Sequence, residues 1–138
     1  MQAIDATNEA NVRPAGARVW AGRVVTTLVV LFLIFDGTTK IVEIAPVIEA
    51  SEKIGLAKHL LPGIGMLLLA CTAVHAIPRT AVLGALLLTA YLGGATAIHV
   101  RAGSGAFETF FAVAFGGLVW LGLVLREPRL VRMILTKE

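Results

Sequence analysis

A run of 12 uncharged residues, VVTTLVVLFLIF at positions 24–35, decides the fold. The pattern around it predicts a helix from Val19 to Ile44 at most, because Pro46 disfavours helical geometry at the residue before it. Three more apolar runs follow, at residues 60–77, 81–98 and 107–125. With its flanks, each run reaches about 18 residues or more, close to the ~20 that cross ~30 Å of hydrocarbon. The sequence therefore predicts four membrane-spanning helices.

The composition of the chain favours the same class. Of 138 residues, 57% are apolar and 15% are charged, whereas roughly 25% are charged in an average soluble domain. A typical soluble globular protein is thereby excluded. The single cysteine, Cys71, excludes an internal disulfide and a Cys-x-x-Cys metal site. The basic residues flank apolar runs, a distribution that indicates membrane topology rather than nucleic-acid binding.

The distribution of lysine and arginine predicts the orientation. Eight of the 12 fall on the side of the two termini and four on the other side, so the positive-inside tendency places both termini in the cytoplasm. The expected fold is an all-α, four-helix transmembrane bundle. We expect three regions: a flexible N-terminal leader at 1–17, a membrane domain at 18–126 and a basic cytoplasmic tail at 127–138. The leader is expected to be flexible because Asn8, Asn11, Pro14 and Gly16 interrupt the helical pattern.

Asp36 is the most informative residue of the first apolar segment. At 1.5 Å per residue it lies about 20 Å above Arg23, below the outer headgroups, where an unpaired carboxylate costs roughly 2.5–3.5 kcal/mol. It should therefore face the bundle and hold either a partner or a proton. Lys40 at i+4 is the expected partner, and Glu43 at i+7 returns to the same face, so the three form one polar stripe.

Other polar residues are expected in the same outer leaflet. On the third helix, Tyr91, Gly94 and His99 share a broad face that offers a phenol, open space and an imidazole. Arg101 ends that helix and Glu108 begins the next, and interfacial anchoring is the simpler explanation of both, beside a role in binding. His75, beside Pro78, is interpreted as an interface residue.

Small residues recur every four positions along the third helix, at Ala81, Ala85, Thr89, Gly93 and Ala97. Such a stripe lets a neighbouring backbone approach closely. It predicts close packing within the bundle, and the small-residue faces are also the expected contact in a homo-oligomer.

Four short motifs resemble the DoxX-like family of small membrane proteins. They are FDGTTK at 35–40, LPG at 61–63, YLGGA at 91–95 and HVR at 99–101. The resemblance covers about residues 20–125, and at position 36 this chain has Asp where family members often have a small residue. It implies a four-helix protein of the bacterial inner (cytoplasmic) membrane. Some relatives are linked to quinone-coupled sulfur oxidation or to membrane redox and stress assemblies.

Two functions are compatible with these residues, beside the third possibility of a structural membrane protein that binds no ligand. The first is an accessory subunit of a membrane redox system that binds a small lipophilic, quinone-like molecule, with a partner subunit supplying the electron carrier. The second is a stand-alone acid–base enzyme, an isomerase or an epoxide- or alkene-converting enzyme, that uses Asp36 and His99. In either case the reactive candidates are Asp36, His99 and Tyr91, and the binding candidates are Lys40, Glu43, Gly94, Glu108 and Arg101. The sequence contains no haem-attachment, iron–sulfur or dinucleotide motif, so no intrinsic cofactor is expected beyond a possible quinone.

Overall fold

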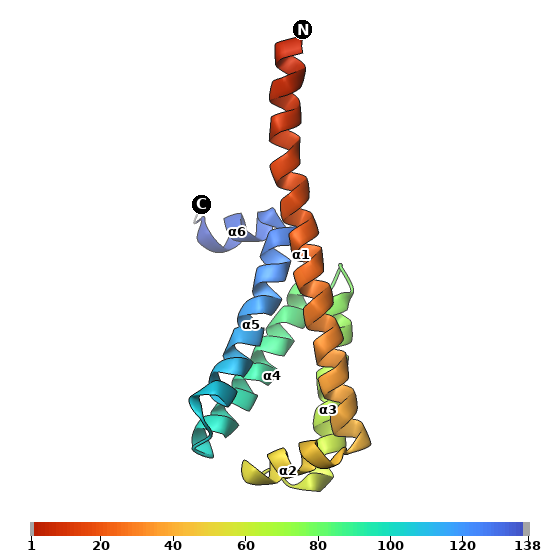
Figure 1. Ribbon diagram of the computed structural model, residues 1–138, viewed down its shortest axis with the longest axis vertical. Coiled ribbons are helices and arrows are strands. Elements are labelled where there is room, and N and C mark those ends of the chain that lie inside the picture. Colours follow the sequence, from red (N-terminus) through yellow and green to blue (C-terminus); the bar gives the residue numbers. More distant parts are fainter. Residues whose placement is uncertain (1, 137–138) are drawn as a thin grey trace.

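The computed structural model describes residues 2–136 of the chain, with side chains from Gly16 to Thr136. This part contains helices and no strand (Figure 1). The elements are α1 (Gln2–Val42), α2 (Ala45–Lys53), the short 3-10 helix η1 (Lys58–Leu60), α3 (Leu61–Ala76), α4 (Ala81–Arg101), α5 (Ala106–Arg126) and α6 (Pro128–Leu135). Four segments are long and apolar enough to span a membrane: Gly16–Val42, Lys58–Ala76, Ala81–Arg101 and Ala106–Arg126. The predicted all-α bundle of four spanning helices is confirmed.

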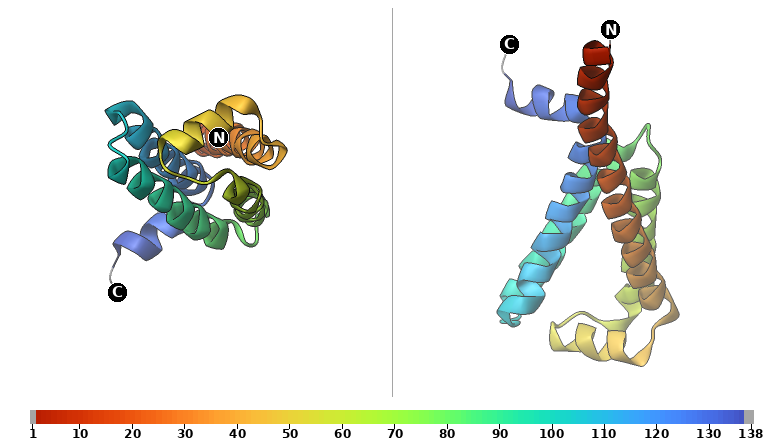
Figure 2. Two further views of the ribbon diagram at one scale, coloured as in Figure 1. Left: turned by 90° about the horizontal axis from the view of Figure 1, so that it is seen from below. Right: turned by 45° about the horizontal axis from the view of Figure 1, so that its top comes forward.

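The four long helices form a ring in which α1 packs against α3 and α5, and α4 packs against the same two helices. The N-terminal part of α1 and the helix α6 lie at one end of the bundle, which we call the terminal end (Figure 1). The helix α2 lies at the other end. From the terminal end, the α1/α3 pair and the α4/α5 pair spread apart, and α2 runs across beyond them (Figure 2). The placement of the terminal end in the cytoplasm remains a prediction from the basic residues.

Each spanning helix contributes at least one large, fully buried leucine to the core, namely Leu33 on α1, Leu61 and Leu68 on α3, Leu88 on α4 and Leu123 on α5. Glycines bring the helices close together around them. At Gly65 on α3, a Cβ atom would lie 2.6 Å from the Gly37 carbonyl oxygen of α1, and at Gly84 on α4 it would overlap the backbone of His75 on α3. These two contacts fix the crossings of α3 with its neighbours.

The small-residue stripe on α4 is only partly correct. Ala81 and Ala85 are buried, but Thr89, Gly93 and Ala97 are exposed. A spacing of four residues drifts by about 40° per step around a helix of 3.6 residues per turn. The buried face therefore continues through Leu88 and Leu92 instead.

Replacing Gly84 by alanine is expected to destabilise the bundle by about 1–3 kcal/mol, because the added methyl group overlaps the His75 backbone. Gly117→Ala on α5 is the matched control, since a Cβ at that position has no atom within 4 Å. Thermal unfolding in mild detergent measures both. Equal stability of the two variants would contradict the close α3–α4 crossing.

Three local features differ from the sequence-based expectation. The predicted irregular leader is helical from Gln2 onward, since α1 continues through Pro14 and Gly16. Extending an existing helix adds one hydrogen bond per residue fixed and needs no new nucleus, and this segment is rich in alanine. The helices α2 and α6 were not expected, because each is too short to give a clear periodic signal.

The third difference concerns His75, which is fully buried rather than interfacial. Its Nδ1 lies 3.0 Å from the Ala81 carbonyl oxygen, so the ring donates to the first turn of α4. The short connection from Ile77 to Thr80 turns the chain back sharply and brings that carbonyl over the ring. His75 therefore ties α3 to α4.

Candidate functional site

A cavity of about 430 Å³ lies between the two helix pairs, toward the α2 end, with lining residues from all four spanning helices and from the segment after α1. Its volume is in the range of small-molecule sites. Most of its wall is apolar, and the polar residues are few. The polar lining residues are Asp36, Lys40, Ser51, Tyr91, His99 and Glu108.

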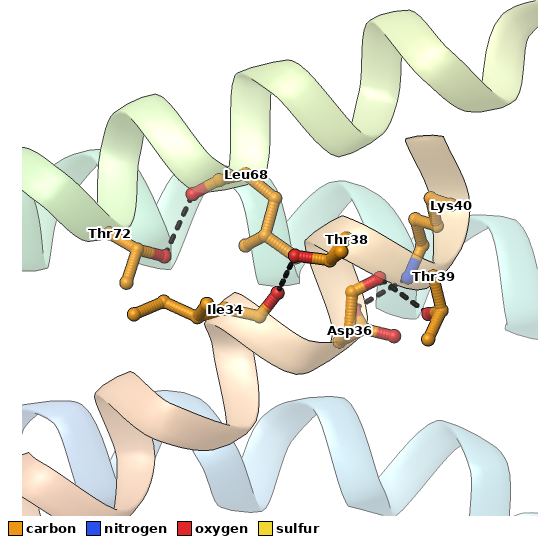
Figure 3. Close-up of polar contacts among 7 residues, drawn as sticks. All are labelled: Ile34, Asp36, Thr38, Thr39, Lys40, Leu68 and Thr72. Atoms are coloured by element: carbon orange, nitrogen blue, oxygen red, sulfur yellow. Dashed lines mark hydrogen bonds and ion pairs between the residues drawn. The ribbon is translucent and has the colours of Figure 1, made fainter. Parts of the chain in front are cut away.

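Asp36 and Lys40 form an ion pair on the cavity wall, as their spacing predicts. The Lys40 Nζ lies 2.5 Å from Asp36 Oδ2 (Figure 3). The lysine side chain is 18% exposed and the aspartate side chain 33% exposed. The Thr39 hydroxyl donates to the Asp36 backbone carbonyl at 2.8 Å, so it is the lysine that holds the carboxylate. Among the described residues, nothing donates a hydrogen bond to Oδ1, which leaves one oxygen available to a ligand.

The expected face of α4 also lines the cavity. Tyr91 is partly buried, and no described residue hydrogen-bonds to its hydroxyl. At Gly94 a Cβ atom would have no neighbour within 4 Å, so the cavity is open beside it. His99 Nδ1 lies 3.1 Å from the Ser104 hydroxyl oxygen, an interaction that orients the ring and leaves Nε2 without a partner among the described residues. Tyr91 and His99 therefore place two hydrogen-bonding groups on the same wall.

Three aromatic rings from α1 and α5 form a second part of the cavity lining, which we call the aromatic wall. Phe32 of α1 has its ring centroid 4.4 Å from that of Phe115 and 5.7 Å from that of Phe111. The Phe111 and Phe115 centroids lie 4.8 Å apart. All three rings line the cavity. They offer a surface against which a flat molecule can stack.

The α2 end of the cavity is covered by a segment with few contacts to the rest of the bundle. Ser51, Ile54 and Leu56, in and after α2, line the cavity, and we call residues 45–57 the roof. Two residues that flank α2 have left-handed backbone, with φ of +56° at Glu43 and +76° at Gly55. A positive φ at Glu43 is uncommon for a residue with a side chain, and it ends α1 and turns the chain into α2.

Two polar contacts lie at the roof, one to the roof itself and one between the residues that flank it, and they involve two predicted binding residues. Arg101 Nη2 donates to the Ile54 carbonyl at 3.3 Å, and Glu43 pairs with Lys58 at 3.6 Å. Neither Arg101 nor Glu43 lines the cavity. The predicted stripe of Asp36, Lys40 and Glu43 is thus broken at its third member, because α1 ends at Val42.

The remaining predicted residue, Glu108, is exposed in the first turn of α5 and lines the cavity. In the part of the chain that the structure describes, no three His, Cys, Asp or Glu residues are grouped as a metal site requires. The aromatic lining residues are suited to stacking, and Asp36, Tyr91 and His99 carry groups that can hydrogen-bond and exchange protons.

The aromatic wall and the roof were not predicted from the sequence. A signal for the wall was present, because Phe107, Phe111 and Phe115 repeat at i, i+4 and i+8 and so share one helix face. The roof had no such signal, since its position depends on the turn at Glu43.

The family comparison agrees with the fold and with the motifs. A model of the DoxX-like family matches residues 24–122, more than two thirds of the chain. The match includes most of each of the four membrane-spanning segments and all six polar cavity residues. No curated protein and no solved structure gives a significant match. This chain is a membrane protein of the DoxX-like family.

Proposed function

We propose that the cavity binds a small, flat lipophilic molecule of the quinone class, and that the chain is an accessory subunit of a redox system in the bacterial inner membrane. The observation that carries this proposal is the composition of the cavity wall. Three phenylalanine rings contribute to a mostly apolar lining, and Asp36, Lys40, Tyr91 and His99 supply a few polar atoms. A mostly apolar site with a small number of oriented polar groups is typical of ligand pockets.

The residues fit a quinone-like ligand in a specific way. The rings of Phe32, Phe111 and Phe115 would stack on the flat ring system. The Tyr91 hydroxyl and the Lys40 ammonium are donors for carbonyl oxygens, and His99 Nε2 can exchange a proton with a hydroxyl. A quinone would supply two-electron chemistry when bound, and a partner subunit would supply the electron path.

The test is a search for bound molecules followed by direct binding. Protein purified in mild detergent is extracted, and the retained lipophilic molecules are identified by mass spectrometry. Binding of menadione and of a short-chain ubiquinone is then measured by calorimetry in the same detergent. We expect a quinone in the extract and saturable binding with a stoichiometry of one. Partitioning without saturation for both probes would contradict the proposal.

A second candidate is a stand-alone acid–base enzyme. The observation that favours it is that Asp36, Tyr91 and His99 all line one cavity, so a proton donor and a proton acceptor can face one substrate. This alternative predicts that the purified chain alone converts a lipophilic epoxide, alkene or ring ketone. The subunit proposal predicts instead that a redox partner co-purifies and that the isolated chain is inactive.

Arg101→Gln is expected to speed the exchange of menadione. The substitution removes the hydrogen bond from the guanidinium to the Ile54 carbonyl, which links α4 to the roof. That bond is long and exposed, so we expect a loss of about 1 kcal/mol, or roughly fivefold faster dissociation. Stopped-flow measurement of menadione release tests this.

Lys53→Gln is the control for this experiment. Lys53 is an exposed cation in the last turn of α2, and it forms no ion pair with any described residue. Its replacement should leave the release rate unchanged. If Arg101→Gln and Lys53→Gln gave the same rate as the unmodified protein, the roof would not limit exchange.

A further inference from the structure

The helix α6 runs across the terminal end of the bundle rather than along its axis (Figure 1). The change of direction occurs at Glu127, whose φ of −122° and ψ of 81° end α5, and Pro128 then starts the new helix at a position that proline favours. Because α5 ends at the boundary of its membrane span, α6 lies at the level where hydrocarbon meets headgroups.

The residues of α6 divide into two sides. Leu130 is half-buried and packs against the hydrophobic core, so it holds α6 against the terminal end of the bundle. Ile134, one turn later on the same side, is 63% exposed. Arg129 and Arg132 are three positions apart, share the other side, and are both exposed. The protein therefore covers only the first part of an amphipathic helix.

The charges around α6 are complementary to an anionic surface. Exposed Arg18 and Arg23 lie near the terminal end on α1, next to exposed Trp20. Among the described residues of this segment, Glu127, directly before α6, carries the negative charge, and the arginines outnumber it. Exposed arginines, an indole and an apolar helix side at one membrane boundary are the combination that binds a headgroup region.

We propose that α6 is an interfacial helix that binds anionic phospholipid. Ile134 and its neighbours Met133 and Leu135, which are 77% exposed, enter the outer part of the acyl region. Arg129 and Arg132 contact phosphate groups, together with the arginines of α1. A phospholipid surface satisfies both sides of α6 at once, which a purely apolar partner does not.

The first experiment measures headgroup preference with the full chain. Native mass spectrometry in detergent compares the retention of phosphatidylglycerol and phosphatidylcholine. We expect phosphatidylglycerol to be preferred, with about a fivefold loss for Arg132→Gln and roughly 25-fold for the Arg129→Gln, Arg132→Gln double variant, at low ionic strength. Lys53→Gln, at the opposite end, should have no effect. Equal losses for Arg132→Gln and Lys53→Gln would overturn the proposal.

The second experiment locates α6 relative to the bilayer. Its result does not depend on how tightly the protein retains individual lipid molecules. An environment-sensitive fluorophore is attached to Ile134→Cys or to Arg129→Cys, with Cys71 replaced by alanine, in vesicles containing phosphatidylglycerol. We expect blue-shifted emission and quenching by brominated lipid at position 134 and water-like emission at 129. Blue-shifted emission at 134 that disappears when the protein is diluted in excess lipid would show that a second copy covers α6, and the proposal would fail. Water-like emission at both positions would also overturn it.

Discussion

Replacing Gly94 by phenylalanine is expected to reduce the affinity for menadione by about 100-fold or more, equivalent to roughly 2.7 kcal/mol. Gly94 lines the cavity, and a Cβ atom at this position has no neighbour within 4 Å. A benzyl group there enters the space that the ligand requires without displacing a neighbouring helix. Calorimetric titration of the purified variant measures the effect.

The adjacent glycine provides a matched control. A Cβ atom at Gly93 would also have no neighbour within 4 Å, but Gly93 is exposed and does not line the cavity. Gly93→Phe therefore adds the same side chain to the same helix on a side that faces lipid. Both substitutions remove a glycine from a helix, so neither should lower the unfolding temperature by much. If both variants bound menadione as the unmodified chain does, the cavity would not be the binding site.

The spanning helices could be located from the sequence because hydrophobic length is a strong signal. The observed helices α3, α4 and α5 agree with the predicted runs to within three residues at each end. Their ends are set by local features, such as the turn containing Pro78 and the glycine at 105, that the sequence displays directly. Helix α6 was not predicted because its eight residues are too few to give a clear periodic signal. The contact between Leu130 and the core, which shows which side of α6 is apolar, is visible only in the structure.

The candidate site was predicted in part, for a comparable reason. Asp36 and Lys40 are one helical turn apart, so their pairing follows from local geometry and depth. Tyr91, Gly94 and His99 share a helix face, and alternating helix direction places that face in the same leaflet. The roof and the aromatic wall depend on tertiary contacts. The positive φ at Glu43, which redirects the chain into α2, leaves no pattern in the sequence.

Replacing Asp36 by asparagine is expected to destabilise the protein by about 1–3 kcal/mol. Removing one member of a buried ion pair leaves the other charge uncompensated, and Lys40 is only 18% exposed. The expected cost is below that of a fully buried pair because the carboxylate side is one-third exposed. Thermal unfolding in detergent measures the loss.

The double variant Asp36→Asn, Lys40→Met separates the structural role of the pair from its role in binding. Without a charge on either residue, most of the lost stability should return, because a neutral pair of similar volume carries no desolvation cost. Menadione binding should remain weaker by about tenfold, the equivalent of one lost hydrogen bond to a charged donor at roughly 1.4 kcal/mol. If the double variant is stable and binds menadione as tightly as the unmodified chain, the ion pair serves the fold alone, and ligand recognition must then rest on Tyr91, His99 and the phenylalanine wall.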